Sequence, residues 1–117
     1  MIKRPRIYDE KHLAFIRKLP CLVCQDNIST QAAHVRMSDA RIAKINPGVG
    51  AKPDDKYTLP LCGECHAKQH SMNEGKFWEY RNIDPVLMSL ALYSASGNIE
   101  EAERIIYARV VNIMAAG

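Results

Sequence analysis

The residues best suited to chemistry lie in one short stretch, 59–70, which contains two cysteines and two histidines. Cys62 and Cys65 form a Cys-x-x-Cys pair, which is the spacing of a zinc knuckle. His66 and His70 are four residues apart, so on a helix they share one face, where two imidazoles can hold one metal ion. The stretch predicts half of a structural zinc site and half of a second, different metal site.

The residues that could complete these sites lie upstream. Cys21 and Cys24 form a second Cys-x-x-Cys pair, so together with Cys62 and Cys65 they could supply four thiolates to one tetrahedral structural zinc. A site of this kind has no open coordination position, so it identifies structure and not activity. His34 follows the first pair and is, with His66 and His70, a candidate functional residue.

Length and composition favour one cytoplasmic domain. The 117 residues are enough for a single domain, and 47% of them are hydrophobic. No apolar run approaches membrane-span length, and the start of the chain lacks the apolar stretch of a secretory signal. We therefore expect a cytoplasmic protein with no membrane partner. In that compartment paired cysteines favour metal ligation over disulfides.

The distribution of charge separates two parts of the chain. Residues 1–81 hold 14 basic and 9 acidic side chains, whereas residues 82–117 hold 2 and 4, so the cysteines and histidines lie in the basic part. This asymmetry suits a polyanion-binding half with a helical appendage, although a merely solvated surface would also explain it. Candidate nucleic-acid contacts flank or lie in the long segment 37–55; they are Arg36, Arg41, Lys44 and Lys52.

Elements of both kinds must position these residues. Asp9 is a plausible N-cap for a helix over 10–18. Residues 30–36 and 56–61 read as strands, the first with His34 near its end, and a helix should begin at Cys62. The aromatic group near Trp78 fits a short helix with a packing role. Asp84 should cap a helix to about residue 94, and 99–114 is amphipathic, which predicts a helical hairpin that supports the core or forms a dimer interface.

This order of cysteine pair, strand ending in histidine, loop, strand and Cys-His helix resembles the HNH endonucleases, the zinc-knuckle branch of the ββα-metal nucleases. The resemblance covers about residues 21–70. It implies that His34 is the general base and that His66 and His70 hold the catalytic metal. Segments around His34 and Leu59 also resemble small HNH proteins of phages and prophages, among them relatives of the phage RecA-dependent nuclease group.

The sequence departs from the family pattern at two positions. Many members have an acidic or histidine metal ligand immediately before the base, where this chain has Ala33. Many also have an asparagine on the second strand that orients the base, where this chain has Tyr57. Asp54 or Asp55 could supply an oxygen ligand to the catalytic metal, and Tyr57 could hydrogen-bond to the base.

The fold expected is α+β: a zinc-stapled ββα-metal core at 21–70, preceded by a basic arm and helix at 1–20 and followed by a helical extension at 71–117. The function expected is a metal-dependent DNA endonuclease from a bacterium or phage. It would use structural Zn²⁺ and a catalytic divalent ion (Mn²⁺, Co²⁺, Ni²⁺, Zn²⁺ or Mg²⁺). Its products would have a 5′-phosphate and a 3′-hydroxyl. It would act as a monomer or a homodimer, and a protein partner in recombination is expected. The alternative is a non-catalytic zinc module that binds nucleic acid or protein.

Overall fold

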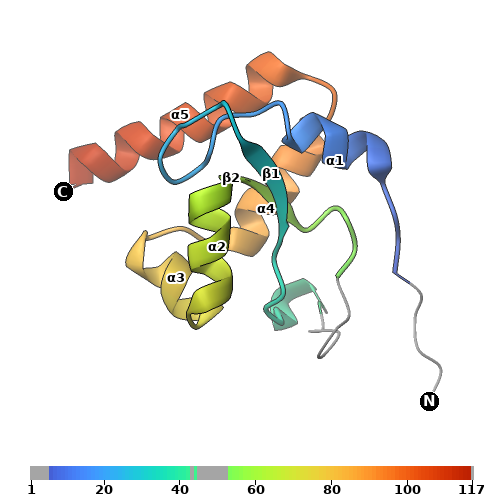
Figure 1. Cartoon of the computed structure of the whole chain (residues 1–117), viewed down its shortest axis with the longest axis horizontal. Helices are drawn as coiled ribbons and strands as arrows, with labels where there is room; N and C mark the ends of the chain where they lie inside the picture. The colour runs from blue at the N-terminus through green and yellow to red at the C-terminus, as the bar shows by residue number, and fades with distance from the viewer. Residues whose placement is uncertain (1–5, 43, 45–52, 117) are drawn as a thin grey trace.

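The computed structural model describes residues 6–42, 44 and 53–116, with side chains as far as residue 109. Two strands and a set of helices make an α+β fold, which confirms the predicted class (Figure 1). The strands are β1 (Thr30–His34) and β2 (Thr58–Cys62), and a short 3₁₀ turn, η1, spans Ala40–Ile42. The helices are α1 (Glu10–Ile16), α2 (Gly63–Ser71), α3 (Glu74–Tyr80), α4 (Pro85–Ser94) and α5 (Ile99–Ala116).

The two strands pair in antiparallel fashion and place Cys62 and His34 at opposite ends of the sheet. Thr30 lies opposite Cys62, and His34 lies opposite Thr58. Every residue of β2 is buried, so helices cover both sides of that strand. The chain then passes directly from β2 into α2, with Cys62 as the N-cap. The order strand, strand, helix therefore matches the prediction.

Side chains at the helix starts explain why the helices begin where they do. Asp9, Asn73 and Asp84 each accept a hydrogen bond from the backbone N–H three residues later, at 3.0–3.1 Å. Such caps satisfy an N–H that has no partner within the helix, and each contributes about 1 kcal/mol. The predicted caps Asp9 and Asp84 are thus confirmed.

The core joins the region of the two cysteine pairs to the C-terminal helices. Ile16 of α1, Leu59 of β2, Phe77 of α3 and Ile106 of α5 are all fully buried. The rings of Phe77 and Trp78 meet edge to face with centroids 4.8 Å apart. The predicted packing role of these aromatics is confirmed for Phe77 and Trp78 and is wrong for Tyr80, which is 87% exposed.

Helices α4 and α5 form the predicted hairpin. Gly97 makes the turn with φ of 88°, a conformation that glycine adopts without steric cost. In Figure 1, α4 lies behind the sheet, where it packs against β2, and α5 runs along the top of the molecule. Ala102 and Ile106 of α5 belong to the same core as the sheet. The hairpin therefore supports the core, as predicted.

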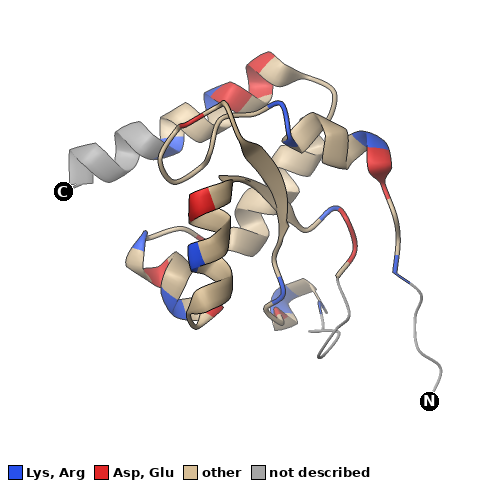
Figure 2. Ribbon diagram, in the orientation of Figure 1, with Lys and Arg blue, Asp and Glu red and all other residues tan. Residues whose placement is uncertain are grey.

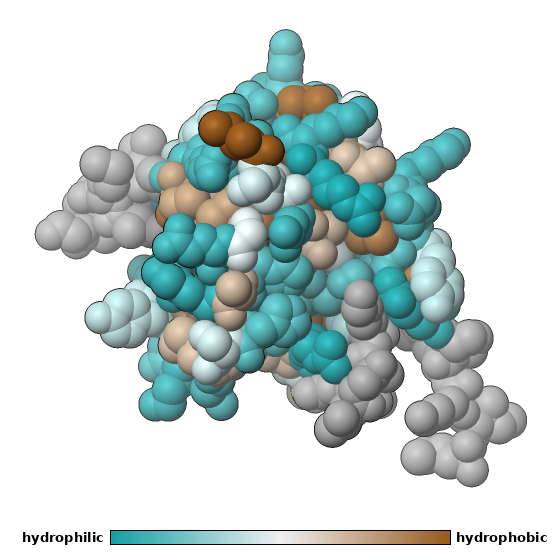
Figure 3. Space-filling view, viewed as in Figure 1, coloured by the Kyte–Doolittle hydropathy of each residue, from teal (hydrophilic) through white to brown (hydrophobic). Residues whose placement is uncertain are grey.

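None of the helices in the described part of the chain is both long and apolar enough to cross a membrane. The face in Figure 3 is largely hydrophilic, with apolar side chains scattered over it.

Candidate functional site

The four cysteines converge on one point. The Sγ atoms of Cys21, Cys24, Cys62 and Cys65 all lie within 4.8 Å of one another. A tetrahedral zinc with Zn–S bonds of about 2.3 Å needs sulfur atoms about 3.8 Å apart, and the distance from Cys24 Sγ to Cys62 Sγ is 3.6 Å. The thiolates are the correct donors for zinc, so the geometry and the chemistry of this group fit a structural metal.

Backbone hydrogen bonds build both halves of the cysteine cluster. The N–H of Cys24 donates to Cys21 Sγ at 3.5 Å, and the N–H of Cys65 donates to Cys62 Sγ at 3.4 Å. The Cys65 N–H bond lowers the pKa of Cys62, which favours the thiolate that binds metal. Burial raises the pKa of Cys65, so this thiolate would depend on a bound cation.

His34 ends β1 beside a buried carboxylate. The Nε2 atom of His34 lies 2.9 Å from Oδ1 of Asp55, whose side chain is fully buried. Arg6 donates from Nη2 to the same Oδ1, and its Nη2 is 3.4 Å from His34 Nε2. The second oxygen, Oδ2, accepts the backbone N–H of Asp9 at 2.8 Å. Three separate segments of the chain therefore meet at Asp55.

These contacts keep Asp55 ionised. Burial opposes the charged carboxylate, but hydrogen bonds from Arg6, the Asp9 amide and His34 together outweigh burial, so the pKa of Asp55 is lowered. The pKa of Arg6 is raised by its bond to Asp55. Both oxygens of Asp55 accept hydrogen bonds, so in this structure the residue is the partner of His34, and its use as a ligand of a catalytic metal stays a prediction.

His66 and His70 form a second group on the surface of α2. Their Nε2 atoms are 3.0 Å apart, and their ring centroids are 4.7 Å apart. Two imidazole nitrogens that each lie about 2.1 Å from one ion would be separated by about 3.0–3.4 Å, so the pair fits a shared metal. Gln31 of β1 places Oε1 2.7 Å from Nδ1 of His66.

The histidines are divided between two environments. Among the described residues, only the four cysteines bring the ligand atoms of three or more His, Cys, Asp or Glu side chains together. His34 lies with Asp55 and Arg6. His66 and His70 supply two metal ligands, and no third side chain of these types joins them in the described part of the chain. A metal at this pair would fill its remaining positions with water or phosphate oxygens.

A buried polar link ties β1 to α2 and α3. Gln69 donates from Nε2 to the backbone carbonyl of His34 at 3.2 Å and to Glu74 Oε2 at 3.1 Å. The same Glu74 accepts the indole N–H of Trp78 at 3.1 Å and the backbone N–H of Arg36. The end of β1 is thereby fixed against the helix that carries His66.

The predicted nucleic-acid contacts have different surroundings. Basic and acidic positions are interspersed along the ribbon in Figure 2. Arg41 is exposed, but it pairs with Asp39 and, at 3.0 Å, with Asp84. Lys44 is only 6% exposed, and its Nζ donates to the carbonyl of Met37, so its prediction as a surface contact is wrong. Arg36 is half-buried. The fourth predicted nucleic-acid contact, Lys52, lies outside the described residues.

The other residues predicted to act near His34 have structural surroundings of their own. Asp54, a possible oxygen ligand of the catalytic metal, accepts the backbone N–H of Ile7 at 2.8 Å. The ring of Tyr57 is buried, and the ammonium groups of Lys44 and Lys56 lie 5.0 and 5.2 Å from its centroid. Ala33 is fully buried. The ring of His34 is oriented by its hydrogen bond with Asp55.

Two residues of these sites were missed from sequence. Arg6 lies in a basic arm, and arms of this kind are usually solvated, so nothing in the sequence paired it with Asp55. Gln31 lies in a short strand of small residues, and only the strand register and the start of α2 bring it to His66.

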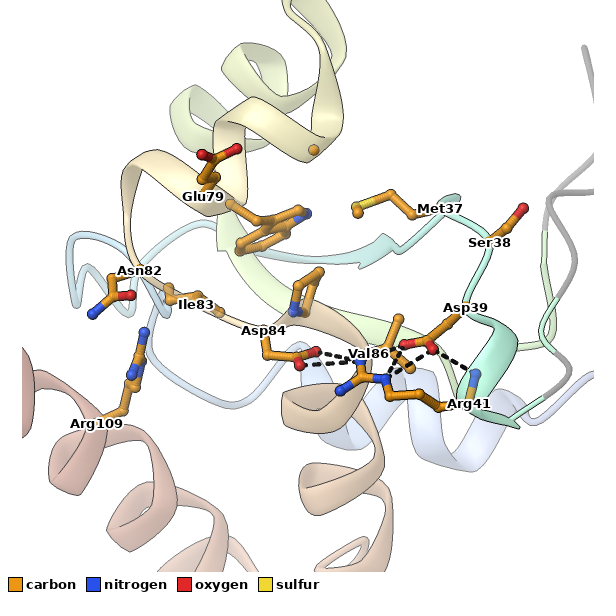
Figure 4. A pocket seen from close by; sticks show the side chains of 13 residues that line it. Met37, Ser38, Asp39, Arg41, Glu79, Asn82, Ile83, Asp84, Val86 and Arg109 are labelled. Carbon is orange, nitrogen blue, oxygen red and sulfur yellow. Dashed lines mark hydrogen bonds and ion pairs between the residues drawn. The ribbon is translucent and has the colours of Figure 1, made fainter.

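A pocket of about 510 Å³ lies elsewhere, between η1 and helices α3 to α5 (Figure 4). The ion pairs of Arg41 with Asp39 and Asp84 form one side, and Arg109 lies on the opposite side. The buried Nε and Nη2 atoms of Arg109 lack a hydrogen-bond partner within the described protein. The described residues that line this pocket include no histidine or cysteine.

Comparison with known proteins places the chain in one family. No curated protein and no solved structure matches it. A family model described as "Protein of unknown function (DUF968)" matches residues 1–95, a span that includes both cysteine pairs, His34, Asp55 and the two histidines of α2. Because this match covers most of the chain, the protein belongs to the DUF968 family.

Proposed function

We propose that this protein is a metal-dependent DNA endonuclease of the HNH type. The observation that carries the proposal is the His66–His70 pair, whose Nε2 atoms are 3.0 Å apart. The helix that bears this pair directly follows β2, and β2 pairs with the strand that ends in His34. A structural zinc at the cysteines would hold this unit together. The basic character of residues 1–81 supports a polyanionic substrate.

In this proposal His34 is the general base. An ionised Asp55 can only accept a hydrogen bond, so in neutral His34 the hydrogen is on Nε2 and the lone pair is on Nδ1. Nδ1 would take a proton from water as that water attacks the phosphodiester. Asp55 holds the ring in this tautomer and would stabilise the imidazolium that results.

His66 and His70 would hold the catalytic ion, with DNA phosphate or water as the further ligands. A bound divalent cation supplies neutralisation of the charge on the phosphoryl and leaving oxygens. The residues themselves fit this task, because imidazole Nε2 atoms are good donors for first-row transition metals and both lie on an accessible part of the helix.

The second candidate is a non-catalytic zinc module that binds nucleic acid or a protein. A specific observation favours it: His34 makes a structural hydrogen bond with the buried Asp55, and no third described ligand joins His66 and His70. In that case the cysteine cluster would provide the whole metal chemistry of the protein.

A plasmid-nicking assay across divalent metals separates the two candidates. The zinc-loaded wild type should convert supercoiled plasmid to the open circle, whereas His34→Ala and His66→Ala should bind DNA without cutting it. Wild-type protein that binds DNA and leaves the plasmid intact with every metal would support the zinc module instead.

A further inference from the structure

We propose that Gln31 is a positioning residue that prepares His66 to bind a divalent transition metal. This inference rests on the proposed function, because it concerns the same metal pair. Gln31 has no role in the resemblance to HNH proteins described above. It comes to His66 from β1, 35 residues away in the sequence.

The contact determines which nitrogen of His66 carries the hydrogen. Gln31 Oε1 lies 2.7 Å from His66 Nδ1, and an amide oxygen accepts hydrogen bonds only, so Nδ1 carries the hydrogen. Nε2 then keeps its lone pair, and this is the atom 3.0 Å from Nε2 of His70. Without Gln31, a neutral imidazole in water favours the opposite tautomer, with the hydrogen on Nε2, where it would block the metal.

The fold holds the Gln31 side chain across the start of α2. Gln31 pairs with Leu61 in the sheet, one residue before the helix cap. Its Nε2 atom lies 3.5 Å from the position that a Cβ on Gly63 would occupy, which is ordinary van der Waals contact. The amide therefore extends over the first turn of α2 and ends at the ring of His66.

Contacts of this kind strengthen metal sites. A histidine ligand usually donates its other ring N–H to an oxygen acceptor, which fixes the ring and makes the ligating nitrogen more basic. Loss of such an acceptor typically weakens metal binding about 10- to 100-fold. Gln31 thus determines how tightly the His66–His70 pair binds metal. A carboxylate at position 31 is a stronger acceptor, so it should make the pair bind metal more tightly still.

The test compares Gln31→Ala and Gln31→Glu with wild type, each with zinc in the cysteine cluster. Nitrogen-15 NMR of the histidine rings reports the tautomer of His66 before any further metal is added. Calorimetric titration with Ni²⁺ then gives the affinity of the His66–His70 pair, with His66→Ala as the background. Ser29→Ala, an exposed change just before β1, is the matched control.

We expect wild-type His66 to carry its hydrogen on Nδ1 and Gln31→Ala to shift the hydrogen towards Nε2. Ni²⁺ affinity should fall about 10- to 100-fold in Gln31→Ala and recover or increase in Gln31→Glu. The inference is overturned if wild-type His66 carries its hydrogen on Nε2. It is also overturned if Gln31→Ala binds Ni²⁺ as wild type does, or if Gln31→Glu is no tighter than Gln31→Ala.

The outcomes also separate this inference from the nuclease proposal. Gln31-dependent Ni²⁺ binding without plasmid nicking would contradict the nuclease and leave the role of Gln31 intact. If the Gln31 variants nick plasmid and bind Ni²⁺ as wild type does, the role of Gln31 alone is overturned. Wild-type protein that binds Ni²⁺ no better than His66→Ala would overturn both.

Discussion

His34 and Asp55 make a hydrogen bond of 2.9 Å between residues that are 21 positions apart. A carboxylate on one ring nitrogen of a histidine leaves the other nitrogen as the base, which is the arrangement that proton abstraction needs. The cost of burying Asp55 is offset by Arg6 and by the Asp9 amide. This one carboxylate therefore connects the chemistry of the proposed base to the N-terminal segment.

Replacement of the base should remove cleavage and preserve binding. We expect His34→Ala to reduce the nicking rate by a factor of about 100 or more, because general-base catalysis contributes 10²–10⁴-fold. DNA affinity, measured by fluorescence anisotropy, should change little. Ser29→Ala, an exposed change just before β1, serves as the control and should cut normally. A His34→Ala protein that cuts at the wild-type rate would contradict the proposed mechanism.

The two-imidazole site should prefer transition metals to magnesium. Imidazole suits Mn²⁺, Co²⁺, Ni²⁺ and Zn²⁺, whereas Mg²⁺ prefers oxygen ligands and keeps its waters. We expect Mn²⁺, Co²⁺ or Ni²⁺ to support nicking better than equal concentrations of Mg²⁺. Strong activity with Mg²⁺ alone would mean that His66 or His70 is not a metal ligand.

Ala33→Asp tests the same preference from the other direction. Ala33 and Gln31 are two residues apart on β1, so they share the face of the strand from which Gln31 meets His66. A carboxylate at position 33 adds an oxygen donor there and should shift nicking towards Mg²⁺. Because Ala33 is fully buried, this variant should also melt at a lower temperature without metal. Ala33→Asn, with similar shape and no charge, should destabilise the fold without shifting the metal preference.

At the scale of elements, the two cysteine pairs converge at one end of a sheet of only two strands. The first knuckle is attached to the sheet by the N–H of Leu22, which donates to the carbonyl of Pro60 at 2.8 Å. The second knuckle is the cap of α2 itself. Isolated two-stranded sheets are marginal in water, so β1 and β2 depend on the packed helices and, we expect, on a metal held by the four cysteines.

Loss of one cysteine should therefore unfold the protein. We expect about one tightly bound zinc per wild-type chain, because structural zinc binding supplies folding free energy. Cys21→Ser should give insoluble protein or a non-cooperative thermal transition. Elemental analysis and circular dichroism would measure both properties. Ser29→Ala is a suitable control, and a Cys21→Ser protein that melts cooperatively without zinc would contradict the structural role.

The elements were predictable because local signals and the tertiary fold agree. Asp84 followed by Pro85 predicts the start of α4, which the structure confirms. The convergence of the cysteines followed from their two equal spacings. The surroundings of Lys44 were not predictable, because a lysine in a polar segment normally extends into water, whereas here the fold places it against Met37 and Tyr57.

Across the protein as a whole, side-chain contacts join segments that are far apart in the sequence. Asp55 binds the N-terminal segment through Arg6 and Asp9, and His12 of α1 meets the turn between α4 and α5. Sequence patterns report periodicity within one element, so they contain no information on these pairs. Both contacts include a titratable group, and both should make the stability of the whole protein depend on pH.

Asp55 should stabilise the fold at neutral pH and lose this effect in acid. Its pKa is lowered in the folded protein relative to the ordinary value of 3.8. The stabilisation is therefore present above that value and is lost as the pH falls through the lower folded pKa. We expect Asp55→Asn to reduce the unfolding free energy by about 3 kcal/mol at pH 7, since it removes one partner of a buried ion pair. Urea titrations should show this difference shrinking below about pH 4.

His12 should contribute a separate pH dependence at milder acidity. Its side chain is 1% exposed, Nδ1 lies 2.8 Å from Ser96 Oγ, and its ring meets that of Tyr93 edge to face. Burial lowers the pKa of His12 below 6.5, although the negative charges of Asp9 and Asp55 oppose this shift.

As the pH falls, His12 is therefore protonated at a higher pH in the unfolded chain than in the folded protein. The contribution of His12 to stability is complete above about pH 6.5 and falls as the pH drops towards the folded pKa, with a slope below the one-proton limit of about 1.4 kcal/mol per pH unit. His12→Phe retains an aromatic ring without a titrating nitrogen, so this part of the slope should disappear from urea titrations between pH 7 and pH 5. An unchanged slope in His12→Phe would assign the pH dependence to another group.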